Sequence, residues 1–284
     1  MDFWRLGLIG YPLEHSLSPQ LHLAALQAVN LPGEYVLYPV RPLPPGQSEL
    51  VGLLLQVWRG ELSGLNVTIP HKQIVLPLLD QLTPAARAIG AVNTIWCEDG
   101  VLWGDNTDAP GFEADVRRFL GSDFGRLPYA LVLGAGGAAR AVVYALAQAG
   151  WAVTIAARRL EQAEALVKSL QPTVTGTLTA VSLSAHVLAD KVAGMGLIVN
   201  ATPVGMTPKT LASPWPGVTF AEDTAVYDLI YNPRDTRLVQ DARAAGVRAT
   251  TGLGMLIEQA SLAFTRWTGQ QVSYEVWRDA VSEN

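Results

Sequence analysis

The sequence predicts an α/β protein that contains two successive runs of alternating strands and helices. Short apolar segments bounded by Gly, Pro or Asn alternate with longer segments of helical period. The expected strands are almost continuously apolar, which is typical of parallel sheets covered by helices on both faces. A glycine-rich turn at 134–137 follows one of these strands and opens the second run.

The first run starts close to the N-terminus with an expected strand at Leu6–Ile9. Two more apolar segments, Glu34–Val40 and Leu65–Ile69, are expected to be strands. Between them, Pro19–Val29 and Ser48–Trp58 have the apolar spacing of helices.

An expected helix at Asp108–Leu120 bridges the two runs, and an apolar helix at Gly254–Trp267 precedes a more polar last helix. The second run has four expected strands and two expected helices. The strands are Tyr129–Leu133, Ala152–Ala156, Leu197–Asn200 and Ala225–Leu229, and the helices are Ala138–Ala149 and Glu161–Leu170.

Composition excludes several classes of function. The chain has 284 residues and a formal net charge of −5, which opposes binding to nucleic acid and anionic lipid. The one cysteine, Cys97, forms neither an internal disulfide nor a zinc site, and no His/Cys/Asp spacing indicates a metal. We find neither a signal-peptide pattern nor an apolar run of the ~18–20 residues that span a bilayer, so we expect a cytoplasmic protein.

The turn after Tyr129–Leu133 has the spacing G-x-G-x-x-A. Gly134 permits a tight turn, Gly136 lets the backbone approach a pyrophosphate, and Ala139 is small enough for close helix–sheet packing. The following helix offers its free N–H groups to phosphates. This strand–turn–helix context predicts a Rossmann-type dinucleotide site, with Ala135, Gly137 and Ala138 completing the turn.

The end of the next strand indicates which dinucleotide binds. An NAD-binding domain usually has Asp or Glu there, whereas this chain has Arg158 and Arg159. Arginine suits a 2′-phosphate, which favours NADP. The alternative is a pair of solvated surface arginines.

Four polar clusters interrupt the first run, and each follows an expected strand or turn. They are Ser16–Pro19, Asn66–Lys72, Ala91–Thr94 and Gly104–Asp108. Ligands of open parallel sheets bind beyond the carboxyl ends of strands, and these hydroxyls, amides, lysine and carboxylate suit a small polyhydroxy acid. Taken one at a time, these residues have simpler interpretations. Ser18 and Asp108 could cap helices, and Lys72 could be a solvated surface amine.

Together the motifs resemble the shikimate dehydrogenase family. They keep one order and cover nearly the whole chain: Gly10–Pro19, Asn66–Lys72, Gly90–Thr94, Gly104–Asp108, Asn200–Met206 and Gly252–Ala260. The resemblance implies an NADP-dependent oxidoreductase acting on a CH–OH group, which interconverts 3-dehydroshikimate and shikimate in aromatic amino acid (chorismate) biosynthesis. It also implies a discontinuous α/β substrate domain, residues 1–107 and 238–284, and a Rossmann-type NADP domain with a parallel sheet, residues 108–237.

The resemblance assigns roles to individual residues. Lys72 and Asp108 match the catalytic pair, and which of them makes the final proton transfer stays open. Substrate contacts are expected from Ser16, Ser18, Asn66, Thr68, Asn93, Tyr231 and Gln259. Cofactor contacts are expected from Gly134, Ala135, Gly136, Gly137, Ala138, Ala139, Arg158, Arg159, Thr202, Met206 and Gly252. We expect none of the four histidines to be catalytic.

Two departures from the family pattern affect the cofactor. Ala157 stands where the family often has asparagine, and Gln162 occupies the place of a later arginine. NADP preference therefore depends mainly on Arg158, and NAD use stays open.

Three alternatives compete with this interpretation. A quinate/shikimate dehydrogenase would have relaxed substrate or cofactor choice, and a non-catalytic sensor of the same fold would bind the same metabolites. A structural or nucleic-acid-binding module is disfavoured by the absence of a basic patch with interleaved aromatics. Small molecules are the expected partners, without nucleic acid or membrane, and the protein is expected to be a monomer or homodimer.

Overall fold

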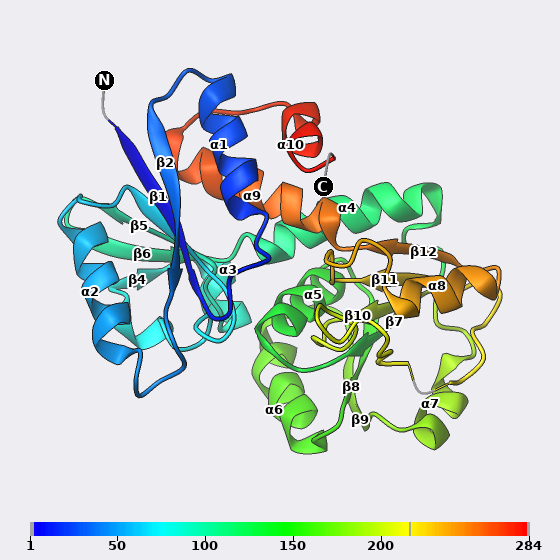
Figure 1. Ribbon diagram of the computed structural model, residues 1–284. Helices are drawn as coiled ribbons and strands as arrows, with labels where there is room; N and C mark the ends of the chain where they lie inside the picture. Colours follow the sequence, from blue (N-terminus) through cyan, green and yellow to red (C-terminus); the bar gives the residue numbers. More distant parts are fainter. Residues whose placement is uncertain (1–2, 216, 283–284) are drawn as a thin grey trace. The chain divides into compact units, whose positions relative to one another are not determined.

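The computed structural model describes residues 3–215 and 217–282. The chain forms two compact units, one made of Met1–Thr107 and Ile257–Asn284 and the other of Asp108–Leu256. Each unit contains a six-stranded sheet with helices packed on it (Figure 1). The predicted α/β class is therefore confirmed.

The sheet of the first unit has the strand order β2-β1-β3-β5-β6-β4. Strands β1 and β2 are parallel, as are β1 and β3, so their carboxyl ends meet at one edge. The strands are β1 (Trp4–Gly10), β2 (Gly33–Pro39), β3 (Gly64–Val67), β4 (Gln81–Leu82), β5 (Thr94–Glu98) and β6 (Val101–Asp105).

The expectation of parallel strands holds for only part of this sheet, because β5 runs antiparallel to both β3 and β6. Strands β5 and β6 form a hairpin in which Glu98 pairs with Val101 across a two-residue loop. Both loop residues, Asp99 and Gly100, have positive φ angles, 52° and 75°. An Asp-Gly pair favours this tight turn, whose twist matches that of the flanking strands.

Helices of the first unit come from both ends of its sequence. Helix α2 (Gln47–Trp58) buries four apolar side chains in a core with Ile9, Leu65 and Ile95 of the sheet. The others are α1 (Ser18–Ala28), α3 (Pro84–Ile89), α10 (Tyr274–Ala280) and the larger part of α9 (Leu253–Thr268), with a 3₁₀ turn at Leu76–Leu78.

A cluster of aromatic rings joins α1 to the C-terminal helices. His22 of α1 stacks on Tyr35 of β2 at 4.5 Å between centroids and also contacts Phe264, Trp267 and Trp277. Trp267 donates a hydrogen bond of 3.0 Å to the Ile95 carbonyl of β5. The C-terminal helices thus complete the core that residues 1–107 begin.

The second unit contains a fully parallel sheet with the strand order β12-β11-β10-β7-β8-β9. Its strands are β7 (Tyr129–Leu133), β8 (Ala152–Ala157), β9 (Leu178–Ser182), β10 (Leu197–Asn200), β11 (Ala225–Asp228) and β12 (Arg248–Thr251). Its helices are α4 (Asp108–Leu120), α5 (Gly137–Gln148), α6 (Leu160–Leu170), α7 (Ala185–Val192) and α8 (Arg237–Ala244), with 3₁₀ turns at Gly121–Asp123 and Gln171–Thr173.

Residues 238–256 lie in the second unit, whereas the family resemblance implied that they belong to the first. Strand β12 pairs in parallel with β11, and α8 connects the two strands. This β–α–β crossover adds one more strand to the parallel sheet, so the chain returns to the first unit at Ile257. The expected boundary at residue 238 therefore requires correction.

Alternate residues of β11 pack on opposite faces of this sheet. Val226 lies in a core with Leu188 of α7 and Leu238 of α8. The next residue, Tyr227, packs edge-on against Phe112 of α4 and donates a hydrogen bond to Asp115. The strand is thus covered by helices on both faces, as its continuous apolar sequence predicts.

We expect His22 to make folding stability fall at mildly acidic pH. Burial lowers its pKa from 6.5 to about 3; the neighbouring Asn66 side chain opposes this shift, although it makes no hydrogen bond of normal geometry with the ring. Between pH 3 and pH 6.5 the His22 ring is therefore protonated in the unfolded chain but not in the folded chain. The contribution of His22 to stability consequently decreases as pH falls through 6.5. The contribution of His22 to the change in stability between pH 7 and pH 5 should be a loss of about 2 kcal/mol.

Urea unfolding of the unmodified protein and of His22→Phe at both pH values measures this contribution as the difference between their pH dependences. His22→Phe should remove most of it, while His186→Gln, at an exposed position, should not. Equal pH dependence in His22→Phe and the unmodified protein would contradict the assignment.

Candidate functional site

Backbone hydrogen bonds connect the polar clusters of the first unit at one edge of its sheet. The Val67 amide donates to the Asn93 carbonyl at 2.9 Å, and the Asn93 amide donates to the Asp105 carbonyl at 3.0 Å. The Val92 amide donates to the Lys72 carbonyl at 2.8 Å. Three clusters that are separate in sequence are therefore adjacent, which follows from the order β3-β5-β6.

The segment before the two serines joins the same edge. The Tyr11 amide donates to the Ile69 carbonyl at 2.9 Å, and the Thr68 amide donates to the Ile9 carbonyl at 2.8 Å. The Ser18 amide in turn donates to the Ser16 hydroxyl at 3.3 Å. The alternative that Ser18 caps a helix is wrong, since Leu17 is the N-cap of α1 and the cap has no side-chain hydrogen bond.

Asn93 is the centre of a buried hydrogen-bond network. Its Nδ2 donates to Thr107 Oγ1 at 2.9 Å and to Gln259 Oε1 at 3.3 Å, and its Oδ1 accepts from the Thr107 amide at 2.8 Å. Asn93 and Gln259 are 166 residues apart in sequence and both are buried. The fold therefore brings the C-terminal helix α9 to the clusters of the N-terminal segment.

Asn66 is fixed just as firmly. Its Oδ1 accepts a hydrogen bond of 2.8 Å from the Tyr35 hydroxyl, and its Nδ2 donates to the Asn93 carbonyl at 3.0 Å. Tyr35 was not predicted to belong to the site, and no motif identifies it. The Asn66 amide is thus held in one orientation by Tyr35 of β2 and by the backbone just before β5.

His71 anchors the segment that contains Lys72. The His71 ring is fully buried, and its Nε2 lies 2.8 Å from the carbonyl oxygen of Val40, just after β2. Because a carbonyl accepts, Nε2 carries a proton in this contact. The Lys72 side chain, in contrast, is only partly buried. The sequence motif places His71 beside Lys72 but does not show this anchoring contact.

The glycine turn of the second unit has the geometry expected of a dinucleotide turn. Gly134 has a φ of +107°, and its amide donates to the Ala156 carbonyl at 2.8 Å. Gly136 is the N-cap of α5, provides no side-chain cap, and has open space where a Cβ would lie. Ala139 is fully buried. The first turn of α5 and the space at Gly136 therefore fit a phosphate group.

Arg158 and Arg159 follow directly after β8, and both are exposed. Arg159 occupies the N-cap position of α6 without a side-chain cap hydrogen bond. Asp108 also belongs to the second unit, where it is the first residue of α4 and is buried.

The remaining predicted residues of the second unit surround the carboxyl ends of β10, β11 and β12. Thr202 follows β10, and its hydroxyl donates to Asn200 Oδ1 at 2.7 Å. The Gly252 amide donates to the Ile230 carbonyl, and a Cβ at Gly252 would collide with the Leu229 carbonyl. Burial raises the pKa of Tyr231, which follows β11, although its side chain keeps some exposure. Met206 is exposed.

Asp228 was not predicted, yet it is the most strongly perturbed carboxyl group of this edge. Burial raises its pKa to about 6, while hydrogen bonds from Thr236, Ile230 and Asn200 favour the ionised form. The motif around Tyr231 includes Asp228 in sequence.

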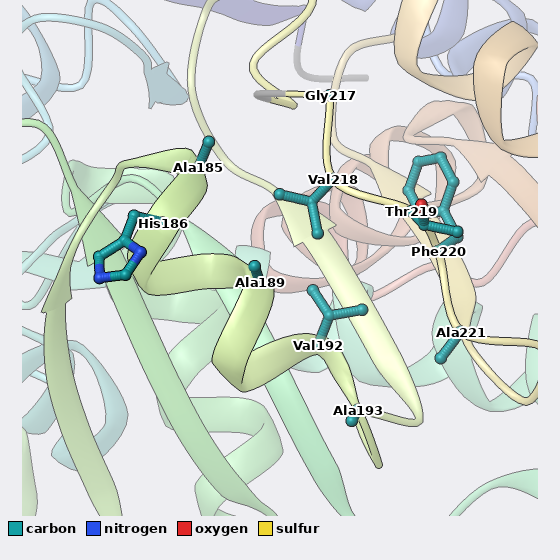
Figure 2. A pocket seen from close by; sticks show the side chains of 10 residues that line it. All are labelled: Ala185, His186, Ala189, Val192, Ala193, Gly217, Val218, Thr219, Phe220 and Ala221. Carbon is teal, nitrogen blue, oxygen red and sulfur yellow. The ribbon is translucent and has the colours of Figure 1, made fainter.

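A cavity of about 640 Å³ lies away from these residues, between α7 and the segment 217–221 (Figure 2). Its lining is mainly alanine, valine and Phe220, and Figure 2 shows the His186 ring pointing away from Val192 and Val218. Apart from Thr219 and His186 the lining is apolar, so it offers few of the polar groups that a polyhydroxy acid requires.

Within residues 3–215 and 217–282 we find no group of three His, Cys, Asp or Glu side chains that could hold a metal ion. In the same residues, the helices are too short or too polar to cross a membrane.

Comparison with known proteins identifies the family. A family model described as "Shikimate dehydrogenase substrate binding domain" matches residues 8–95, and one described as "Shikimate 5'-dehydrogenase C-terminal domain" matches residues 252–281. A shikimate dehydrogenase (NADP(+)) of Salinibacter ruber is 43% identical over 96% of this chain and 95% of its own length. The chain belongs to the shikimate dehydrogenase family.

Solved structures of family members have the same fold. Shikimate 5-dehydrogenase of Thermus thermophilus, in complex with NADP(H) and shikimate, superposes with a TM-score of 0.82 at 38% identity and covers 98% of both chains. Quinate dehydrogenase of Corynebacterium glutamicum, in complex with NAD, gives a TM-score of 0.85 at 32% identity, covering 98% of this chain and 99% of its own. The two-domain α/β fold is thus that of the family, which includes enzymes named for two substrates.

The glycine turn generates a paired prediction on stability. Gly134→Ala should destabilise the protein by about 1–2 kcal/mol, because its φ is positive and the new Cβ would lie 3.1 Å from both the Ala201 carbonyl oxygen and Thr202 Cγ2. Gly136→Ala should leave stability unchanged within about 0.5 kcal/mol, because its φ is −83° and the space is open. Denaturant unfolding of both variants tests this, and equal losses would refute the distinction.

Proposed function

We propose that the protein is an NADP-dependent shikimate dehydrogenase that reversibly reduces 3-dehydroshikimate to shikimate with NADPH, in aromatic amino acid (chorismate) biosynthesis. The observation that carries the proposal is the near full-length similarity to shikimate dehydrogenases (NADP(+)). The polar network of the first unit and the glycine turn of the second support it with suitable chemistry.

The residues of the first unit suit a carboxylated ring with several hydroxyls. In the proposal, Ser16 and Ser18 hold the carboxylate, with Tyr231 of the second unit as a further contact. The ring hydroxyls are assigned to Asn66, Thr68, Asn93 and Gln259. Asn93 already uses both amide hydrogens on Thr107 and Gln259, so substrate binding has to compete with the longer of these bonds, the 3.3 Å bond to Gln259.

The cofactor site is assigned to the second unit. Residues 134–139 would accept the pyrophosphate at the start of α5, where the N-cap supplies no side-chain acceptor. Thr202, Met206 and Gly252 would line the same carboxyl edge of the sheet. Arg158 would pair with the 2′-phosphate, and Arg159 would compensate for the family asparagine that Ala157 replaces.

The reaction requires a hydride and a proton. When bound, the cofactor would supply from its nicotinamide the hydride that the C3 carbonyl carbon accepts. Lys72 is proposed to donate a hydrogen bond to the carbonyl oxygen and stabilise its growing negative charge. Asp108 would hold the lysine amine and share in the proton transfer that converts the alkoxide into the alcohol.

A second candidate is a quinate/shikimate dehydrogenase that also uses NAD, which the similarity to a quinate dehydrogenase with bound NAD favours. Quinate has an additional hydroxyl at C1, so the contacts near Ser16, Ser18 and Tyr231 would determine the choice. A non-catalytic metabolite sensor is the third candidate, and the presence of both Lys72 and Asp108 opposes it.

Absorbance at 340 nm distinguishes these candidates. The purified protein should reduce NADP+ with shikimate at a higher kcat/KM than for any of the other pairings of shikimate or quinate with NADP+ or NAD+. Comparable values for quinate would establish the second candidate. Nucleotide binding with no turnover of either acid would establish the sensor.

The catalytic assignment predicts that Lys72→Ala lowers kcat by about 10²–10⁴-fold with a smaller change in the KM for shikimate, because general acid–base help is lost. Lys168→Ala, at an exposed position of α6, is the matched control and should keep the original rate. Near-normal turnover of folded Lys72→Ala protein would refute the role.

The cofactor assignment predicts that Arg158→Ala raises the KM for NADP+ about tenfold and leaves the KM for NAD+ nearly unchanged, because a charged hydrogen bond to a phosphate contributes about 1.5–3 kcal/mol. Arg59→Ala removes an exposed arginine of the first unit and serves as the control. Parallel changes for both dinucleotides would show that Arg158 does not recognise the 2′-phosphate.

The proposal includes small molecules as the partners of a cytoplasmic protein that is a monomer or homodimer. The net charge of −5 supports this choice against nucleic acid and anionic lipid.

A further inference from the structure

Two buried polar side chains, Asn200 and Asp228, connect the loops at the carboxyl edge of the parallel sheet. Asn200 is the last residue of β10 and Asp228 the last residue of β11, and the two are paired in the register of these strands. Asn200 Nδ2 donates to Asp228 Oδ1 at 2.8 Å, and both side chains are fully buried.

Each member of the pair holds one loop. Asn200 Oδ1 accepts from the amide and the hydroxyl of Thr202 at 2.9 and 2.7 Å. Asp228 accepts from the Ile230 amide at 3.1 Å and from the Thr236 hydroxyl at 2.7 Å. The loop that contains Thr202 and Met206 is therefore tied through two side chains to the loop that contains Tyr231.

The loop held by Asn200 lies directly against the glycine turn. A Cβ built on Gly134 would be 3.1 Å from both the Ala201 carbonyl oxygen and Thr202 Cγ2. The Ala201 amide donates to the Leu133 carbonyl, the residue before Gly134. A displacement of residues 201–202 would therefore change the space beside the turn.

Burial of this carboxylate is costly, so its hydrogen bonds have to offset that cost. A buried ionised carboxyl is costly unless each of its acceptor sites is used, and here three donors surround it. Such fully satisfied networks fix one arrangement of the groups that they connect. The groups connected here are the two loops of the proposed cofactor edge.

We propose that Asn200 and Asp228 are positioning residues of the dinucleotide site, which hold Thr202 beside Gly134 in the arrangement that binds NADP. This inference rests on the proposed function only for the identity of the dinucleotide. Neither residue is assigned a contact with substrate or cofactor.

The test compares NADPH binding in variants that remove different hydrogen bonds of the network. Asn200→Ala removes the hydrogen bonds from Thr202 to Asn200. We expect this variant to raise the Kd for NADPH about tenfold, as measured by fluorescence titration. Thr236→Val removes the hydrogen bond from Thr236 to Asp228. It also removes the N-cap of α8, where the Thr236 hydroxyl accepts from the Val239 amide. We expect it to lower the melting temperature and to raise the Kd for NADPH less than Asn200→Ala does.

Asn200→Asp preserves the shape of the side chain and provides a second variant if Asn200→Ala does not fold. It places two carboxylates together, so the Kd should rise at pH 8 and return toward the original value at pH 6, where a shared proton restores the hydrogen bond. The unmodified protein and Thr236→Val, titrated at the same pH values, correct for the ionisation of NADPH itself.

The proposal is overturned if Asn200→Ala and Thr236→Val weaken NADPH binding equally, or if Asn200→Asp binds as the unmodified protein does at both pH values. Because the titration contains no shikimate, it remains decisive even if the unmodified protein binds NADPH without oxidising shikimate. That last result would overturn the proposed function alone.

Discussion

The structure depends on satisfying polar groups that are buried at the carboxyl ends of its strands. At the end of a parallel strand, the last amide and carbonyl groups lose their partners in the sheet. These groups and the buried polar side chains beside them then need other hydrogen-bond partners. In the first unit Asn66 and Asn93 supply these partners, and in the second Asn200 and Asp228 do. The same atoms that complete the fold therefore define the shape of the surfaces proposed to bind ligands.

Much of the fold could be predicted because its strands are buried on both faces. Tyr129–Leu133 and Leu197–Asn200 are continuous apolar segments, and each is a strand with the predicted bounds. Strand β12 (Arg248–Thr251) lies at the edge of its sheet and is partly exposed, so its sequence is too polar and short to reveal a strand. This strand and helix α8 place residues 238–256 in the second unit, whereas the family resemblance implied that they belong to the first.

The candidate site could be predicted only where chemistry is concentrated in short motifs. Asn93, Gln259 and the glycine turn were proposed in this way, and the structure shows that Asn93 donates a hydrogen bond to Gln259. Tyr35 and His22 belong to no motif, because their roles come from packing between elements far apart in sequence. Asp228 lies 28 residues from its partner Asn200, and only the strand order makes them neighbours.

The position of Trp267 has a consequence for synthesis of the protein on the ribosome. Its indole donates to Ile95 and packs so closely on Gly64 that a Cβ there would collide with it. The sheet made by the first 107 residues thus stays incompletely covered until the last helices have been translated. All strands of the parallel sheet in residues 108–256 are translated before these last helices. The middle of the chain can therefore form its native core before the beginning does.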